Sequence, residues 1–368
     1  MNAAALLALV GRRIALRPGA TTLLTLSVFA LCFVAVSVFL FQQGVEQTAR
    51  HVIAAGPSLV VSRVDAGGWA PMPAAEAQRI ARIRGVSQAT ARVWGVLPGP
   101  PAVTLMGSPL LPDGSSEAIT GTGPAAIANH GILSLRGLDG SVSTFRVQRV
   151  LDRTSDLATH DMVLVSMAAA RRLLLLGDDD ATDVAIRAVQ PQEEEALARE
   201  VAADAPWPLR VVTRKQLDGA YMAQLGQRSG LTTMTLVPSI LALALLVAGI
   251  AAGGDKARRE VGKLKLLGWS TGQIATLHLL EVAVPAGAGT FAGVALGYAQ
   301  LFVFGGGSLT ATVLGWEGTA PHLWLDSTGA ALTMVQVAAL VLAPCGVAAA
   351  VPSWRLAHAD PLELIEAP

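Results

Sequence analysis

Charged residues are scarce in this sequence, and neither sign is in excess. Asp, Glu, Lys and Arg form 15% of the 368 residues, whereas a soluble protein has about 25%. The formal net charge is zero, which excludes an overall electrostatic attraction to nucleic acid, so we expect no nucleic-acid partner. Hydrophobic residues form 52% of the chain, and the mean hydropathy is +0.51. Much of the surface is therefore expected to face membrane lipids rather than water.

Cysteine is nearly absent as well. Cys32 and Cys345 are the only two, and both lie in apolar runs, so a disulfide framework is not expected. The sequence also lacks GxxxxGK(S/T), HExxH, CxxC and GxSxG, the motifs of phosphate loops, zinc hydrolases, redox pairs and serine hydrolases. Its six histidines are too scattered to predict a metal cluster. We therefore expect no catalytic residue, metal or bound cofactor in this chain.

Four long apolar runs occupy much of the chain. Residues 21–41 read TTLLTLSVFALCFVAVSVFLF without a charge, and a helix of that length rises roughly 31 Å, the thickness of a bilayer's hydrocarbon core. A cleaved signal peptide has a shorter apolar core and then a small-residue cleavage site, so a retained span is favoured. The other runs are residues 231–253, 274–304 and 328–351. The four runs together predict a four-helix transmembrane bundle.

Basic residues flank these runs unevenly. They precede the first run, lie between the second and third, and follow the fourth, whereas the loop between the third and fourth contains none. Lys and Arg collect on the cytoplasmic side of membrane proteins. We therefore expect the amphipathic N-terminal segment 1–20, the segment 254–273 and the tail 352–368 in the cytoplasm. The long segment 42–230 and the loop 305–327 are expected on the outer side.

The long segment 42–230 predicts an α+β domain inserted between the first and second spans. Short β-rich runs such as SLVVSR at 58–63 alternate with helical patterns such as 191–203, where a proline and three successive glutamates suit a helix start. The segment is long enough to bury its own core. Residues 217–227 look helical and run into the second span. The stretch 111–123 is expected to be an ordinary surface connection, with a mobile partner-binding loop as the alternative.

The segment between the second and third spans is the most informative. Residues 255–271 read DKARREVGKLKLLGWST, where basic and apolar residues predict a partly amphipathic helix before a Gly-Trp turn. A basic amphipathic helix can lie along a membrane surface. It can also insert its apolar face into a groove on a cytoplasmic partner. Composition alone leaves both interpretations open.

Glycine recurs every four residues in the third span. Gly289, Gly293 and Gly297 share one helix face, and small residues at this spacing let another helix approach closely. We predict that this face packs against a transmembrane helix of the same or a partner subunit, so that Gly293→Leu would weaken assembly. Near the start of the span, Glu281 and His278 are expected at the membrane interface, paired with headgroups or basic residues.

Three motifs lie in order along the membrane half of the chain, at residues 258–270, 281–297 and 352–365. Together they resemble those of the MacB/FtsX-type permeases, the type VII ABC transporters. The first comprises Arg258, Arg259, Glu260, Val261, Leu264, Lys265, Leu267, Gly268, Trp269 and Ser270. The second is Glu281 followed by the three spaced glycines. The third comprises Pro352, Trp354, Arg355, Ala357, Asp360, Pro361 and Ile365. Order, spacing and topology agree across the membrane half, and the lack of a fused ATPase domain is similar to the separately encoded permeases.

The resemblance implies a non-catalytic permease subunit that dimerises with a second copy or a homologue and works with a separate cytoplasmic ABC ATPase. That ATPase, not this chain, would bind ATP and Mg. It would dock on the helix between spans two and three, the coupling helix. The implied polar contacts are Arg258, Arg259, Glu260, Lys263 and Lys265, and the implied apolar anchors are Leu264, Leu267 and Trp269. Leu264→Asp together with Leu267→Asp is expected to release the ATPase.

The implied activity is mechanotransmission. ATP hydrolysis would move the outer domain for export or extraction of a substrate at the outer side of a bacterial inner membrane. The alternative is an FtsX-like signalling permease that activates an extracytoplasmic hydrolase or other partner. A sensor or adhesion module without an ATPase would leave the first and third motifs unexplained. The substrate, the type of dimer and the participation of a periplasmic membrane-fusion protein stay open.

Overall fold

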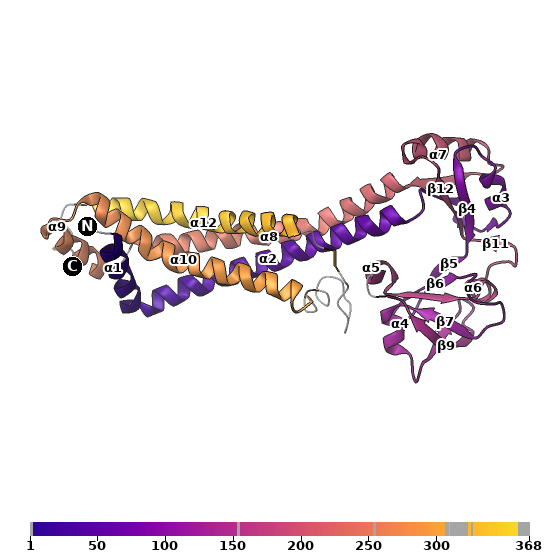
Figure 1. Ribbon diagram of the computed structural model, residues 1–368, viewed down its shortest axis with the longest axis horizontal. Coiled ribbons are helices and arrows are strands. Elements are labelled where there is room, and N and C mark those ends of the chain that lie inside the picture. The colour runs from indigo at the N-terminus through magenta and orange to yellow at the C-terminus, as the bar shows by residue number, and fades with distance from the viewer. Residues whose placement is uncertain are drawn as a thin grey trace. The chain divides into compact units, whose positions relative to one another are not determined.

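The computed structural model describes residues 3–152, 155–252, 255–305, 309, 323–324 and 327–359 (Figure 1). The chain forms two compact units. One, called the membrane unit below, comprises Met1–Gln43, Gln227–Gly306 and Leu325–Pro368. The other, the inserted domain, comprises Gly44–Gly226 and Gly307–Trp324. Asp360, Pro361 and Ile365 of the third motif and most of the predicted loop 305–327 lie outside the described residues.

Four helices in the described part of the chain are long and apolar enough to cross a membrane, which confirms the four predicted spans. They are α2 (Pro18–Ala55), α8 (Arg214–Ala252), α10 (Thr271–Phe302) and α12 (Ser327–His358). α2 has 38 residues and α8 has 39, whereas about 20 suffice to cross a bilayer. Each of these two helices carries residues of both units.

The long helices share one apolar core in the membrane unit. Its buried residues are contributed by all four helices and include Leu24, Val28, Cys32, Val247, Val282, Ala286, Val341 and Cys345. Both cysteines are free thiols. Apolar side chains therefore fill the middle of this unit.

Two short helices, α1 (Ala3–Leu16) and α9 (Asp255–Leu266), lie at one end of the membrane unit, called the α9 end below (Figure 1). α1 contacts α10, and α9 contacts both α10 and α12. Because α9 begins near the end of α8 and is followed by α10, it is the connection between the second and third spans.

A tight turn joins α9 to α10. The N–H of Trp269 donates to the carbonyl of Leu264 at 3.1 Å, the bond that defines a Schellman helix end. Gly268 adopts a φ of +88°, which glycine tolerates without a steric cost. Ser270 and Gln273 then form a capping box that begins α10. The predicted Gly-Trp turn is therefore built from a helix stop and a helix start in direct succession.

The inserted domain has two lobes. Lobe 1 is an antiparallel sheet in the order β13-β1-β12-β4, with β2 paired to β1. Its strands are β1 (Leu59–Asp65), β2 (Gly68–Ala70), β4 (Val86–Arg92), β12 (Asp183–Ala188) and β13 (Leu209–Thr213). The helices α3 (Glu76–Ala81) and α7 (Glu194–Ala203) cover it, because Ile80 and Leu197 are buried against Leu59, Val61, Val184 and Ile186. The short pair β3 (Met72–Pro73) and β11 (Asp180–Ala181) lies apart from this sheet.

Lobe 2 is a mixed sheet of six strands in the order β5-β6-β10-β7-β9-β8. The strands are β5 (Trp94–Leu97), β6 (Val103–Gly107), β7 (Glu117–Thr120), β8 (Ile132–Arg136), β9 (Val142–Val150) and β10 (Met162–Val165). Its helices are α4 (Thr122–Ile127), α5 (Asp156–Thr159) and α6 (Met167–Leu174). Leu173 of α6 is buried with Leu105, Leu133 and Val163, so this lobe has a core of its own. The two lobes together confirm the predicted α+β domain.

The prediction of a surface loop over residues 111–123 is wrong. β7 lies inside this stretch and pairs with β10 on one side and β9 on the other. Ala118 and Ile119 are buried, and α4 begins at Thr122. The strand has only four residues, and its Gly- and Ser-rich flanks conceal it, because so short an apolar run carries little periodic signal.

Candidate functional site

The coupling helix α9 packs one face on its own chain. Val261 is buried in a cluster with Ile274 of α10 and with Leu356 and Ala357 of α12. The Nζ of Lys265 donates a hydrogen bond to the carbonyl oxygen of Ala359. The first and third motifs lie about a hundred residues apart in the chain, but both contribute residues to this cluster. Both motifs therefore help to hold α9 against α10 and α12.

Some of the predicted apolar anchors lie on this buried face, and another is exposed to solvent. Leu264 and Trp269 pack half-buried against the cluster. Leu267 is 77% exposed, and its neighbour Leu266, which the sequence analysis passed over as an anchor, is 68% exposed. The run of two leucines before the Gly-Trp turn was the available signal for this pair. The exposed apolar surface of α9 is thus Leu266–Leu267, while Leu264 and Trp269 hold the helix in place.

The predicted polar contacts also fall into two groups: exposed side chains, and side chains that pair within the chain. Arg258, Arg259 and Lys263 are exposed along α9. Glu260 instead accepts hydrogen bonds from Arg13 of α1 at 3.0 Å and from Arg17 at 3.1 Å. Docking of an ATPase on these side chains stays a prediction, and the structure assigns Glu260 and Lys265 contacts within the chain.

A network of charges links α1, α9 and α10. Arg13 donates from Nη1 to Oε1 of Glu281 at 2.7 Å, and its Nη2 pairs with Glu260. His278, one turn before Glu281, places Nδ1 at 3.2 Å from Oε2 of Glu281. The expected pairing of Glu281 with a basic residue is confirmed, and its partner lies in the N-terminal helix. One guanidinium therefore joins the coupling helix to the third span.

Replacing Arg13 by Met should lower the free energy of unfolding by about 1–3 kcal/mol, the usual cost of losing hydrogen bonds to a charged group. The side chains of Arg13 and Glu281 are only 15% and 16% exposed, so water compensates Glu281 poorly. Thermal unfolding of the purified full chain measures this loss. Arg50→Met is the matched control, because Arg50 and Glu46 pair at 2.8 Å with exposures of 57% and 39%, and such pairs contribute about 0–1 kcal/mol. Equal losses in the two variants would contradict the network's role.

The glycine face of α10 packs against α2 of the same chain. A methyl group on Gly289 would lie 2.5 Å from the carbonyl oxygen of Thr25, and one on Gly293 would lie 2.6 Å from that of Phe29. A methyl on Gly297 would lie 3.0 Å from Cγ1 of Val36. The sequence left the partner helix open between this subunit and another. The structure places the first span there, at a distance that only glycine permits.

A cleft lies in the inserted domain between its two lobes. It has a volume of about 340 Å³. Lobe 1 contributes residues from β1, β2 and the start of β12, and lobe 2 contributes residues from β5, the end of α6 and the turn before β9. The sequence analysis missed this site, because its lining residues come from separate segments that share no motif.

Comparison with known proteins identifies the membrane half. Residues 232–361 match the family model described as FtsX-like permease C-terminal. This segment is similar to the C-terminal domain of FtsX-like permeases. The matched range holds α9, α10 and α12 and confirms the resemblance to MacB/FtsX-type ABC permeases. With its four long apolar helices, the chain is therefore a multi-pass membrane protein that contains an FtsX-like permease segment.

No curated protein sequence matches this permease. Among solved structures, the extracellular domain of the noncanonic ABC-type transporter YknZ from Gram-positive bacteria is similar, with 13% identity and a TM-score of 0.30. That match covers 42% of this chain and 99% of the other. The periplasmic region of MacB from Actinobacillus actinomycetemcomitans is similar with 9% identity and a TM-score of 0.32, covering 46% of this chain and 95% of the other. At these identities and scores, neither likeness bears on ligands or partners.

Proposed function

We propose that this permease couples ATP hydrolysis by a separate cytoplasmic ATPase to movement of its inserted domain on the outer side of the membrane. The observation that carries the proposal is the two-sided character of α9. One face packs on α10 and α12, whereas Leu266, Leu267 and the basic side chains of Arg258 and Lys263 are exposed. A helix with exposed apolar anchors suits insertion into a partner's groove.

The contacts around α9 connect it mechanically to the long helices of the membrane unit. The cluster of Val261, Ile274 and Leu356 ties α9 to two spans, and Arg13 ties it to α1 and α10. The glycine face then holds α10 against α2. α2 and α8 are each one helix that carries residues of both units. A displacement of α9 would therefore reach the inserted domain through packed helices, because packed interiors transmit strain.

The apolar core of the membrane unit supports action on a substrate outside the membrane rather than passage of a substrate through the helix bundle. Its middle is filled by apolar side chains from all four long helices, such as Val28, Val247 and Val341. The basic residues flanking the spans support a cytoplasmic position for the α9 end and both termini. The permease would function as a dimer in a bacterial inner membrane, and ATP and Mg would be bound by the partner ATPase.

The proposal is tested by following the inserted domain during ATP hydrolysis. The tagged full chain is purified from native membranes, and the bound ATPase is identified by mass spectrometry. Cys32 and Cys345 are replaced by Ala, and a spin label is placed at exposed Ile132 through Ile132→Cys. In a dimer, the distance between the two labels should change when ATP and Mg are added. An unchanged distance during measured ATP hydrolysis, or the absence of any ATPase in the purified material, would overturn the proposal.

A further inference from the structure

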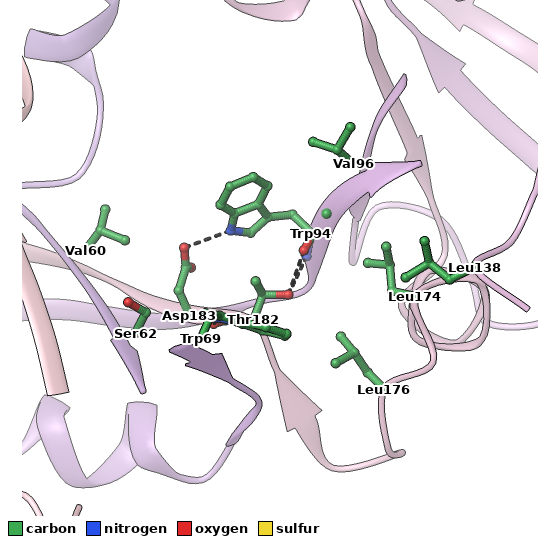
Figure 2. Close-up of a pocket in the computed structure, with 11 residues that line it drawn as sticks. Val60, Ser62, Trp69, Trp94, Val96, Leu138, Leu174, Leu176, Thr182 and Asp183 are labelled. Carbon is green, nitrogen blue, oxygen red and sulfur yellow. Dashed lines mark hydrogen bonds between the residues drawn. The ribbon is translucent and has the colours of Figure 1, made fainter. Parts of the chain in front are cut away.

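The cleft between the lobes gathers apolar side chains from both. Lobe 1 supplies Val60 and Trp69, and lobe 2 supplies Trp94, Val96, Leu138, Leu174 and Leu176 (Figure 2). In Figure 2 Val60 lies on one side of Trp94, and Val96 and the three leucines lie on the other. Trp69, Val96 and Leu138 are about half exposed to solvent. Apolar surface left in water is unfavourable, so a concentration of it in a concave site indicates a binding site.

Four residues of the wall, Trp69, Trp94, Thr182 and Asp183, have their polar groups paired within the protein. Thr182 Oγ1 donates to the carbonyl oxygen of Trp94 at 2.7 Å and accepts from its N–H at 3.0 Å. The indole N–H of Trp94 donates to Asp183 at 2.8 Å, as the dashed line in Figure 2 shows. Arg92 donates twice to the same carboxylate, each time at 2.7 Å. The indole N–H of Trp69 donates to the carbonyl oxygen of Thr182 at 3.0 Å.

This pairing determines what the cleft offers to a ligand. The charge of Asp183 is compensated by Arg92, and the Asp183 side chain is almost fully buried. Both indole N–H groups are used, so the tryptophans present their apolar rings. At the rim, Asp139 accepts hydrogen bonds from the hydroxyl and the N–H of Ser141, which lower the pKa of that carboxyl and shape the turn that carries Leu138. The walls therefore favour an uncharged, apolar ligand.

The size of the cleft limits the ligand further. At about 340 Å³ it lies in the range of small-molecule sites, about 300–1,000 Å³. That volume corresponds to about eleven water molecules at ~30 Å³ each. An α-helix, about 10–12 Å across with its side chains, is too large for it. The apolar side chains are spread from one lobe to the other, which suits an extended ligand rather than a compact one.

We propose that this cleft binds a linear apolar chain of about ten carbon atoms, the chemistry of a lipid acyl chain. The chain would lie beside β5, the edge strand of the sheet in lobe 2, and would contact the rings of Trp69 and Trp94. The inference names a ligand class for the inserted domain, and it rests on the proposed function only for a role of that ligand in transport. Binding itself needs neither ATP nor the ATPase.

The test measures how a bound chain protects a cysteine in the cleft. Val96→Cys is made in the full chain with Cys32 and Cys345 replaced by Ala, in lipid nanodiscs without nucleotide. Val142→Cys in β9 is the matched control, because both valines lie in strands of lobe 2, with exposures of 55% and 61%, and only Val96 lines the cleft. The rate of alkylation by a water-soluble maleimide is measured with increasing 1-decanol.

Decanol at ten times its Kd should slow alkylation at Val96→Cys about tenfold, by mass action, and should leave Val142→Cys unchanged. Leu138→Cys, a second reporter on the rim, should be protected at the same decanol concentration. 1-Adamantanol, a compact alcohol with the same number of carbon atoms, should protect neither. Unchanged rates, equal slowing at Val142→Cys, or protection by adamantanol instead of decanol would each overturn the proposal. Because no ATPase is present, any of these results is distinct from a failure of the proposed function.

Discussion

Leu266→Asp together with Leu267→Asp should release the ATPase from the permease while the permease stays folded. Both leucines are exposed on α9, so a carboxylate costs the isolated permease little. In the complex, the same carboxylates would be buried in an apolar groove of the partner. Apolar anchors at the centre of an interface contribute about 2 kcal/mol or more each, which is roughly a 30-fold loss of affinity per anchor.

The measurement is the yield of ATPase that co-purifies with the tagged permease, together with the melting temperature of the permease alone. Leu267→Met is the control, because it keeps an apolar side chain of similar volume and should keep the complex. The pair Leu264 and Leu267, which the sequence favours, is a poorer test. Leu264 packs on the cluster around Val261, so Leu264→Asp would disturb the seat of α9 as well. An unchanged ATPase yield with the exposed pair replaced would refute docking on this surface.

Gly293→Ala should destabilise the membrane unit by about 1–3 kcal/mol, the usual cost of overpacking a tight interface. The added methyl would lie 2.6 Å from the carbonyl oxygen of Phe29 and 2.9 Å from Cβ of Cys32. Since the nearest of these is a backbone atom of α2, no side-chain rotation relieves the overlap, and the two helices must separate. Gly293→Leu, with a larger side chain, should prevent the packing of α10 on α2 altogether.

The matched control for this variant is Gly287→Ala in the same helix. In the described part of the chain, a methyl group at Gly287 would meet no atom of another helix within 4 Å, and Ala is a better helix former than Gly by about 1 kcal/mol. Gly287→Ala should therefore leave the melting temperature unchanged or raise it. The measurement is the melting temperature of the three purified variants, Gly293→Ala, Gly293→Leu and Gly287→Ala. Equal melting temperatures for Gly293→Ala and Gly287→Ala would show that the close approach of α2 does not limit stability.

Much of the membrane half was predictable from the sequence, because lipid imposes a simple rule on it. A helix must satisfy its own backbone hydrogen bonds in a bilayer, so a span shows as a long uncharged run. The capping residues around Gly268 are local in the same way, since a helix stop and a helix start each involve a few successive residues. The short strand β7 was missed because Ala118 and Ile119 owe their burial to strands distant in sequence.

The sequence did not predict which side of α9 is buried and which is exposed. α9 has 12 residues and includes Leu264 and Leu266, and Leu267 follows it directly, so apolar residues lie on more than one side. Contacts with Leu356 and Ala357, far along the chain, decide that Leu264 is covered and Leu267 is not. The pairing of Glu260 with Arg13 is equally non-local. Such choices are made by packing, which sequence periodicity does not record.

Four long apolar helices, an α+β insert and a basic connecting helix with the motifs of an ABC permease were all predictable from the order of the amino acids. Those properties follow from composition, spacing and charge along short stretches. Three further features arise from packing in the folded chain: the glycine face meets α2 of the same chain, Leu266 and Leu267 are the exposed pair at the end of α9, and Trp69 and Trp94 face one cleft. Each of these features depends on contacts between segments that are distant in sequence. The stabilising energy of such contacts belongs to no single segment.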